Sequence, residues 1–464
     1  MATGPPEESL SVTVNAKIFR EYDIRGIVEE DLDVLTIRSI GRGIGTYLGG
    51  QSGGTLAVGR DGRLSSPAVR VSLIDGLRAS GCNVIDVGMV PTPILYFALH
   101  HLGVQGGVMV TGSHNPPEYN GFKINQGEES LTGEEIRAIH RIIEERAYSE
   151  GNGIARPADV TTVYQTLVES KFSFSRSLKV AVDAGNGVAG TVAVSILEAF
   201  GHTVFPLYCD PDGHFPNHHP DPSVPENLVD LSACVLREGA DLGIAFDGDG
   251  DRLGAVDERG NVLWPDQLLI LFARDLLTHQ PGAPIVFDVK CTQNLPRAIE
   301  SAGGQPIMWK AGHSLIKKKL RTEDSPLGGE FSGHFFFADD YFGYDDALYA
   351  ALRLMDLLCR AEKPLSFLLA DLPTLHSSPE LKFPCPDAEK FQVVEALKGR
   401  MRDRYHLIEI DGIRVELDGG WGLIRASNTT PALTARFEAE SPERLKAIQE
   451  EILDHLKAFS SVEA

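Results

Sequence analysis

Three stretches of this 464-residue chain repeat the same order of strands, loops and helices. They begin at Thr55, Leu178 and Pro284, with the segments TLAVGRDGR, LKVAVDAGNG and PIVFDVKCTQN. In the first two, VRVSLIDGLRASG and TVAVSILEAFG are typical of crossover helices that stop at Gly81 and Gly201. The period is about one hundred residues, which indicates duplicated α/β domains rather than a solenoid. Because ligands bind beyond the carboxyl ends of strands in open α/β sheets, such domains offer three homologous loops: TGSHN, DGDGDR and GEFSGH.

The repeat stops at about Thr374. Strand-like IRVELDGG, GLIRASNTT and ALTARFEAE follow, and then a helix that Ser441 caps and Pro442 begins. An apolar stripe runs along this helix at helical spacing: Leu445, Ile448, Ile452, Leu456 and Phe459. We therefore predict the α/β fold class, with three homologous α/β domains of mixed sheets and a smaller C-terminal α+β domain. The predicted boundaries are 1–158, 159–261, 262–373 and 374–464.

The balance of charges excludes some partners. With 65 acidic and 43 basic residues the formal charge is -22, so the surface repels nucleic acid, and an anionic ligand needs a locally basic pocket. The six cysteines form no CxxC pair, which argues against a zinc site and fits a reducing cytosol. The N-terminus lacks the features of a signal peptide, and no apolar run reaches the roughly 18 residues of a membrane span. We expect a cytoplasmic protein that binds neither nucleic acid nor membranes.

The segment AFDGDGDR carries the clearest metal signal. Asp247, Asp249 and Asp251 alternate with glycines after an apolar strand, and their carboxylates would repel one another without a cation between them. A hard divalent ion, with Mg²⁺ favoured, suits these oxygen ligands. An EF-hand loop is the first alternative, but its sixth position requires glycine and here holds Arg252. A solvated acidic loop without a metal is the second.

Ser113, in VTGSHNPPEYNGFK, is the candidate nucleophile. It follows an apolar strand, but a serine hydroxyl reacts only where a base, a metal or a positive field activates it. The competing interpretation is a helix-capping serine before a proline-rich turn. A nearby metal site favours the functional interpretation. A serine hydrolase is disfavoured because G-x-S-x-G is absent.

A second glycine pattern points to a different function. Gly185, Gly187 and Gly190 form a literal G-x-G-x-x-G with Asp210 about twenty residues on, as in dinucleotide-binding sites. Asp183 precedes the loop, however, and its negative charge would oppose a pyrophosphate. The equivalent loops GRDGR and KCTQN lack the pattern, so we disfavour a dinucleotide site.

Other polar loops predict recognition of a phosphorylated sugar. Glu330 and Ser332 of GEFSGH can bind hydroxyl groups, and His334 could move a proton. Lys290 and His313 are pocket candidates, whereas part of the KKK run after His313 is expected to face solvent. One short loop combines a cation with hydroxyl and amide donors, as a phosphate monoester requires: Arg425, Ser427, Asn428, Thr429 and Thr430.

Together these motifs resemble the α-D-phosphohexomutase family, and within it the bacterial phosphomannomutase/phosphoglucomutase group. The resemblance covers nearly the whole chain without a departure in the motifs FREYDIRG, TGSHNPPEYNGFK, DGDGDR, WKAGHSLIKKK, GEFSGH and RASNTTP, in that order. It implies four domains around a central cleft. It also implies a reversible shift of phosphate between the 1- and 6-positions of mannose or glucose. A phosphoserine donates the phosphoryl group, and the bisphosphorylated sugar turns around before returning the other phosphate.

The resemblance also assigns roles to residues. Ser113 is similar to the phosphoserine, whose phosphate completes a magnesium site with Asp247, Asp249 and Asp251, and Arg252 steadies it. The residues similar to those around the transferring phosphoryl group are Tyr22, Arg25, His114, Lys123 and His334. Glu330 and Ser332 correspond to sugar-hydroxyl contacts. The residues similar to the clamp for the other phosphate are Lys290, His313, Arg425, Ser427, Asn428 and Thr429.

The expected cofactors are one Mg²⁺ per chain and glucose 1,6-bisphosphate or mannose 1,6-bisphosphate as activator. The expected partners are sugar phosphates, and we expect a monomer or a weak homodimer. Two alternatives stay open: a phosphoglucosamine mutase, and a phosphosugar-binding protein that has lost catalysis. The sequence does not rank mannose against glucose, because that choice depends on the placement of one hydroxyl group.

Overall fold

The structure is a computed structural model that describes residues 14–49, 54–428, 430–459 and 461–462. Its contacts divide the chain into two compact units. The first contains residues up to Tyr164 together with Pro211–Pro216, and the second contains Gln165–Asp210 and the chain from Asn217 onward. Each unit is described by itself. In the described part of the chain, no helix combines the length and apolar character that crossing a membrane requires.

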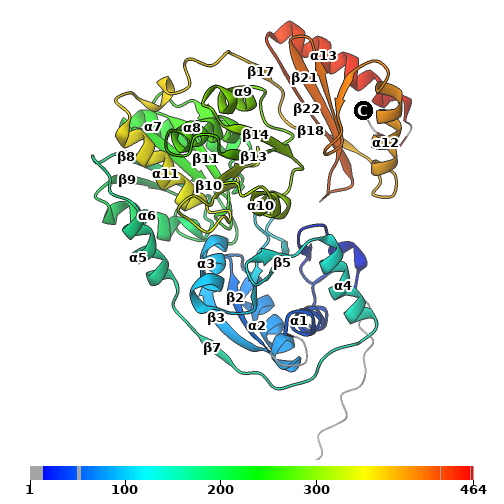
Figure 1. Cartoon of the computed structure of the whole chain (residues 1–464). Helices are drawn as coiled ribbons and strands as arrows, with labels where there is room; N and C mark the ends of the chain where they lie inside the picture. The colour runs from blue at the N-terminus through cyan, green and yellow to red at the C-terminus, as the bar shows by residue number, and fades with distance from the viewer. Residues whose placement is uncertain (1–13, 50–53, 429, 460, 463–464) are drawn as a thin grey trace, which may run out of the picture. The chain divides into compact units, whose positions relative to one another are not determined.

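The first unit is built on one mixed sheet (Figure 1). In spatial order its strands are β1 (Ile24–Ile27), β5 (Tyr119–Gln126), β4 (Gly106–Val110), β2 (Thr55–Arg60), β3 (Asn83–Met89) and β7 (Ala155–Pro157), with β6 (Glu129–Ser130) beside β5. Its helices are η1 (Ala16–Ile18), α1 (Val34–Gly49), α2 (Ser66–Ala79), α3 (Thr92–Leu102) and α4 (Gly133–Glu144). Helices α1, α2 and α4 share one core with Leu56 and Val58 of β2, and α3 packs on the opposite face of β2 and β4.

The second unit begins with two further mixed sheets. The strands of the first are β12 (Val262–Leu263), β11 (Leu253–Asp257), β10 (Leu242–Phe246), β8 (Lys179–Asp183) and β9 (Thr203–Leu207). Those of the second are β14 (Gln305–Trp309), β13 (Pro284–Asp288), β15 (Leu327–Gly329) and β16 (Phe335–Phe337). The helices of this part are α5 (Thr161–Lys171), α6 (Ala189–Ala199), η3 (Pro225–Leu228), α7 (Val229–Glu238), α8 (Pro265–His279), α9 (Asn294–Ser301), α10 (His313–Thr322), α11 (Ala347–Arg360) and η4 (Leu365–Phe367).

The three sheets share one topology. In each, a central strand (β2, β8, β13) pairs in parallel with the second and third strands, and an antiparallel strand (β5, β11, β16) follows the third. Helices α2 and α6 end just before Gly81 and Gly201, which both have positive φ, as the repeat predicts. The prediction of three homologous α/β domains is confirmed. Consequently TGSHN, DGDGDR and GEFSGH occupy equivalent positions, between the third strand and the antiparallel strand.

The C-terminal part is the predicted α+β domain with an antiparallel sheet (Figure 1). Its strands are β17 (His376–Ser377), β18 (Leu381–Pro384), β19 (His406–Ile408), β20 (Ile413–Leu417), β21 (Gly420–Ala426) and β22 (Ala432–Ala439), and its helices are α12 (Lys390–Met401), α13 (Pro442–Asp454) and η5 (Leu456–Ala458). The Ser441 side chain caps α13, as predicted. Helices α12 and α13 pack on one face of this sheet, whereas Trp421 and Leu423 pack against Val289, which follows β13.

Candidate active site

Ser113 lies in the loop after β4, in a backbone conformation that is rare for a residue with a side chain. Its φ is +48°, and its side chain is only 2% exposed. The Ser113 N–H donates to Thr111 Oγ1 (2.8 Å), and its hydroxyl lies 3.2 Å from His114 Nδ1. A strained conformation held by its surroundings is typical of a functional loop rather than of a helix cap.

Strand pairing brings further candidates to this loop. β1 and β5 pair antiparallel, as do β5 and β4, so Arg25 and Lys123 lie on strands of the same sheet edge. The Arg25 guanidinium donates to Asn115 Oδ1 (2.6 Å), two residues after Ser113, and pairs with Asp23. Lys123 is buried, and Tyr22 is half-buried just before β1. In this unit Arg25, His114 and Lys123 therefore lie on β1, on the Ser113 loop and on β5, the strand that follows this loop.

The three aspartates form a tight turn between β10 and β11. All three side chains are 0% exposed, and their ligand oxygens lie within 4.8 Å of one another. Asp247 Oδ1 accepts hydrogen bonds from the N–H groups of Gly250, Asp251 and Arg252. Because β10 and β11 form a hairpin, the flanking helices of an EF-hand are replaced by strands, and that alternative is excluded. Buried carboxylates this close fit one hard divalent cation.

Two neighbouring loops fix the backbone of this turn. The N–H of Gly248 donates to Pro220 O (3.2 Å), and its carbonyl accepts from Val188 N (3.2 Å). A Cβ on Gly187 would lie 2.8 Å from the oxygen and 2.9 Å from the Cα of Gly248. The doubtful nucleotide fingerprint therefore has a structural explanation: Gly187 permits a close approach between two backbones.

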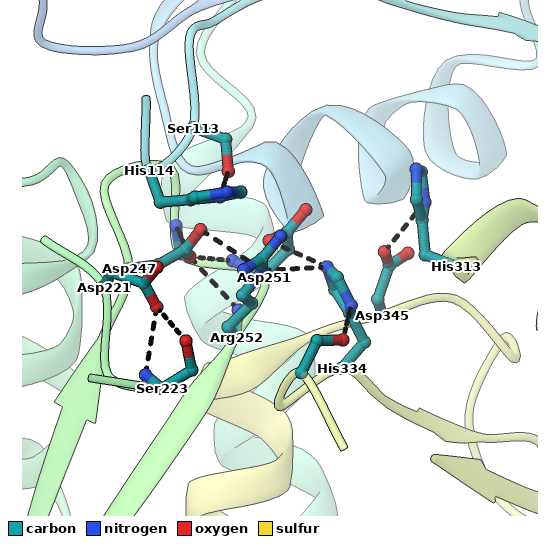
Figure 2. Close-up of polar contacts among 12 residues, drawn as sticks. Ser113, His114, Asp221, Ser223, Asp247, Asp251, Arg252, His313, His334 and Asp345 are labelled. Atoms are coloured by element: carbon teal, nitrogen blue, oxygen red, sulfur yellow. Dashed lines mark hydrogen bonds and ion pairs between the residues drawn. The ribbon is translucent and has the colours of Figure 1, made fainter. Parts of the chain in front are cut away.

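A buried ion-pair network connects the metal loop with GEFSGH (Figure 2). His334 Nε2 lies 3.4 Å from Asp251 Oδ1, and His334 Nδ1 lies 2.9 Å from Glu330 Oε2. Burial lowers the pKa of His334, but Asp251 and Glu330 outweigh this effect and raise it to about 9. The protonated imidazole is a cation and not a metal ligand. Arg252 Nε lies 3.4 Å from His334 Nε2; a protonated imidazole cannot accept a hydrogen bond from it, so the two groups are neighbouring positive charges and Arg252 opposes the rise in the pKa of His334.

His313 begins α10 and lies 3.3 Å from Asp345, as Figure 2 shows. Asp345 is completely buried, and the Lys317 ammonium lies 2.9 Å from its other oxygen. Burial lowers the pKa of His313, which Asp345 offsets only in part, so this imidazole is neutral at neutral pH. Within the KKK run, Lys318 is exposed as expected, whereas Lys317 is part of this buried cluster.

The candidate phosphate clamp joins two domains of the second unit. Arg425 donates to Asp411 Oδ2 (2.9 Å), and the same oxygen accepts from Ala311 N, two residues before His313. Lys290 pairs with Glu380 at 3.4 Å. Burial lowers the pKa of Lys290, but the carboxylates of Glu380, Asp288 and Glu330 together outweigh it and the net pKa is raised.

The remaining clamp residues belong to the loop after β21. The Ser427 hydroxyl accepts from the N–H and the hydroxyl of Thr430. Asn428 is half-buried beside it, whereas Thr429 lies outside the described residues. The Ser332 hydroxyl oxygen, in the GEFSGH loop after β15, lies 2.9 Å from His334 Nδ1. The second unit therefore holds the three aspartates of the predicted metal site and the described candidates for sugar-hydroxyl contacts and the clamp, whereas Ser113 belongs to the first unit.

Sequence reasoning missed the residues that support these loops. Asp345 and Asp411 hold candidate side chains from loops that carry no motif. His218 contacts both oxygens of Asp183, at 3.1 and 3.0 Å, and thus anchors the loop whose Pro220 supports Gly248. The only signal in the sequence is position, because Asp183 ends the central strand of its repeat.

The fold and the site together define a multidomain α/β protein with a buried acidic loop suited to a divalent cation. Four parts of the chain match the descriptions "Phosphoglucomutase/phosphomannomutase, alpha/beta/alpha domain I", "domain II" and "domain III" and the "C-terminal domain", at residues 16–150, 160–260, 264–376 and 380–455. The chain is 48% identical to a phosphomannomutase/phosphoglucomutase of Pseudomonas aeruginosa over 453 residues, 97% of each chain. It is 44% identical to a phosphoglucomutase of Neisseria gonorrhoeae, over 94% of this chain and 96% of the relative.

Among solved structures, a phosphoglucomutase/phosphomannomutase family protein of Burkholderia thailandensis superposes with a TM-score of 0.90 at 44% identity. The match covers 96% of this chain and 98% of that one. The chain therefore belongs to the phosphoglucomutase/phosphomannomutase family of enzymes.

Proposed function

We propose that this enzyme moves a phosphoryl group reversibly between the 1- and 6-positions of mannose or glucose phosphates, with Ser113 as the phosphorylated residue and a hexose 1,6-bisphosphate as intermediate. The observation that carries the proposal is the buried trio Asp247, Asp249 and Asp251 in a chain of this family. Three buried carboxylates repel one another and destabilise a protein core unless a cation lies between them. A cytoplasmic location and a monomeric or weakly dimeric state stay predictions.

The three aspartates, together with the phosphate on Ser113, would hold one Mg²⁺, which when bound neutralises charge on the phosphoryl oxygens. In the first half-reaction the O–P bond of phosphoserine breaks as a sugar hydroxyl oxygen forms a new O–P bond, and the proton of that hydroxyl passes on balance to the released Ser113 oxygen. In the second half-reaction the other O–P bond of the bisphosphorylated sugar breaks as the Ser113 oxygen forms a new O–P bond, and the serine proton passes on balance to the released sugar oxygen. Positioning and charge neutralisation supply most of the catalysis for this loose transition state.

Several side chains suit particular tasks in this reaction. Arg252 places positive charge beside the acidic loop, and the imidazole of His334, 3.4 Å from the Arg252 Nε, lies where it can carry a positive charge or move a proton. Glu330 is buried and accepts a hydrogen bond from the N–H of Gly312, and its carboxylate can also accept hydrogen bonds from sugar hydroxyl groups. Lys290 and Arg425, with the Ser427 loop, would bind the phosphate that is not transferred.

The direct test combines a mass measurement with an assay. Intact mass should show a fraction of the purified protein with one added phosphoryl group, about 80 Da, located on the Ser113 peptide. Ser113→Ala should lose that mass and at least about 10⁴-fold of the mutase activity, because the acceptor oxygen is absent. Ser427→Ala, which leaves the acceptor in place, should remain phosphorylated. If Ser113→Ala converts mannose 1-phosphate at the parental rate, the assignment of the nucleophile is wrong.

The substrate range needs its own comparison. The chain is 37% identical over 445 residues to a probable phosphoglucosamine mutase of Methanopyrus kandleri. Coupled assays of mannose, glucose and glucosamine 1-phosphates, each with and without glucose 1,6-bisphosphate, rank the three substrates and test the activator. A kcat/KM highest for the amino sugar would favour phosphoglucosamine mutase. An inactive binding protein would bind the sugars without turnover.

A further inference from the structure

Arg63 is almost completely buried, and its contacts were not predicted from any sequence motif. It lies in the GRDGR loop after β2 and is only 1% exposed. One terminal nitrogen donates to the carbonyls of Ser113 (2.8 Å) and Asn115 (2.5 Å). The other donates to the carbonyls of Pro116 (2.5 Å) and Tyr119 (3.0 Å). One side chain thus binds four backbone oxygens of the loop that carries the candidate nucleophile.

Asp61 completes this arrangement from the same loop. Its Oδ2 accepts from Gly112 N (3.0 Å) and lies 3.2 Å from Arg63 Nε. Its Oδ1 accepts from Arg63 N and Ser66 Oγ. One buried ion pair therefore holds the peptide bond after Ser113, through the Ser113 carbonyl, and the peptide bond between Thr111 and Gly112, through the Gly112 N–H.

The Arg63 guanidinium lies very close to Gly112, the residue before Ser113. A Cβ on Gly112 would lie 2.4 Å from Arg63 Cζ and Nε. The centroid of the Phe215 ring lies 5.3 Å from Arg63 Cζ, within the range of a cation–π contact. Phe215 belongs to Pro211–Pro216, the segment that joins the first unit although its neighbours in sequence belong to the second. The guanidinium thus packs closely against a glycine and also contacts an aromatic ring.

A residue with a side chain and a φ of +48° stays in that conformation only where its surroundings hold it. Arg63 and Asp61 supply such a restraint, because they bind the Ser113 carbonyl and the Gly112 N–H of the backbone directly. Lysine could not replace this function, because a single ammonium group cannot match the planar fork of a guanidinium.

We propose that Arg63, held by Asp61, is a positioning residue that fixes the Ser113 oxygen for phosphoryl transfer. The proposal rests on the proposed function, in which Ser113 accepts and donates the phosphoryl group. Arg63 contacts the Ser113 loop through four backbone carbonyls, so it acts on the serine oxygen through the backbone of that loop. It sets the rate of transfer and not the affinity for the sugar, whose candidate ligands lie in the other unit.

The test compares Arg63→Lys with Arg70→Lys. Arg70 is a matched control because it lies on α2 in the same unit and pairs with Asp86 of β3 instead of with the Ser113 loop. We expect Arg63→Lys to lower kcat by about 100-fold, the effect of a misplacement of about 1 Å, while KM for glucose 1-phosphate changes less than about threefold. Arg70→Lys should keep the parental kcat. In ³¹P NMR of the phosphorylated proteins, the phosphoserine resonance should be sharp in the parent and broad or split in Arg63→Lys.

Global destabilisation alone would lower the melting temperature but would leave kcat of the folded fraction and the ³¹P line unchanged. If Arg63→Lys does not fold, Asp61→Asn carries the same test, since it keeps the shape and removes the charge that holds Arg63. A parental kcat and a sharp resonance in the folded variant would overturn the proposal. Absence of mutase activity in the parent would instead refute the proposed function.

Discussion

Replacing Gly187 by alanine should push the acidic loop out of place. The added Cβ would lie 2.8 Å from the Gly248 oxygen and 2.9 Å from its Cα, where both partners are backbone and cannot rotate away. To reach an ordinary contact of 3.4 Å the two loops must separate by about half an ångström. That separation lengthens the hydrogen bonds that hold Gly248 between Val188 and Pro220.

Two magnitudes follow. Overpacking of this kind costs about 1–3 kcal/mol of folding free energy. Because Gly248 lies between Asp247 and Asp249, the displacement also reaches two candidate metal ligands. A misplacement of reacting groups by about 1 Å lowers kcat by about 100-fold, so a displacement of about half an ångström should lower kcat by about tenfold.

The assay measures the free energy of unfolding in urea at a series of Mg²⁺ concentrations and obtains the Kd for Mg²⁺ from its logarithmic rise, which needs no turnover. We expect a higher Kd for Mg²⁺ in Gly187→Ala. Gly399→Ala is the control, since Gly399 lies exposed in α12 with no atom within 4 Å of the added Cβ. It should stabilise the protein by up to about 1 kcal/mol without changing the Mg²⁺ response. Parental stability and Mg²⁺ response in Gly187→Ala would refute the steric reasoning.

Two further predictions concern the buried charges. Lys317→Met should destabilise the protein by about 3–5 kcal/mol in urea, because it leaves the buried carboxylate of Asp345 without its ammonium partner. Lys318→Met, at an exposed position, should change stability by less than about 0.5 kcal/mol, and equal effects would contradict this explanation. In metal-free protein, NMR should find His334 protonated at pH 7 and titrating near 9, since Asp251 outweighs its burial. Its folded pKa lies above the unfolded value of about 6.5, so the stability that it contributes is complete below that pH and disappears as pH rises through about 9. Titration of His334 at or below 6.5 would contradict the network.

Much of the fold could be predicted because its signals are local. Strand and helix periodicity, Gly81 and Gly201 after helices, and Ser441 before α13 depend on neighbours in sequence, and all three agree with the structure. The helix α12 was not predicted, because its sequence lacks a clear apolar stripe and only its packing on β20 and β21 stabilises it.

By itself, the sequence determined the order of domains, the equivalence of the three loops and the types of side chain that each loop presents. Those properties follow from residue type and short spacing. Only the tertiary structure decided which residues hold the loops: Arg63 under Ser113, Gly187 against Gly248, and Asp345 between His313 and Lys317. These contacts join residues that are far apart in the chain. The identity of a charged residue or a glycine in the sequence does not show which residue it will contact in the folded protein. The partner of such a residue is set by packing, which no local pattern records.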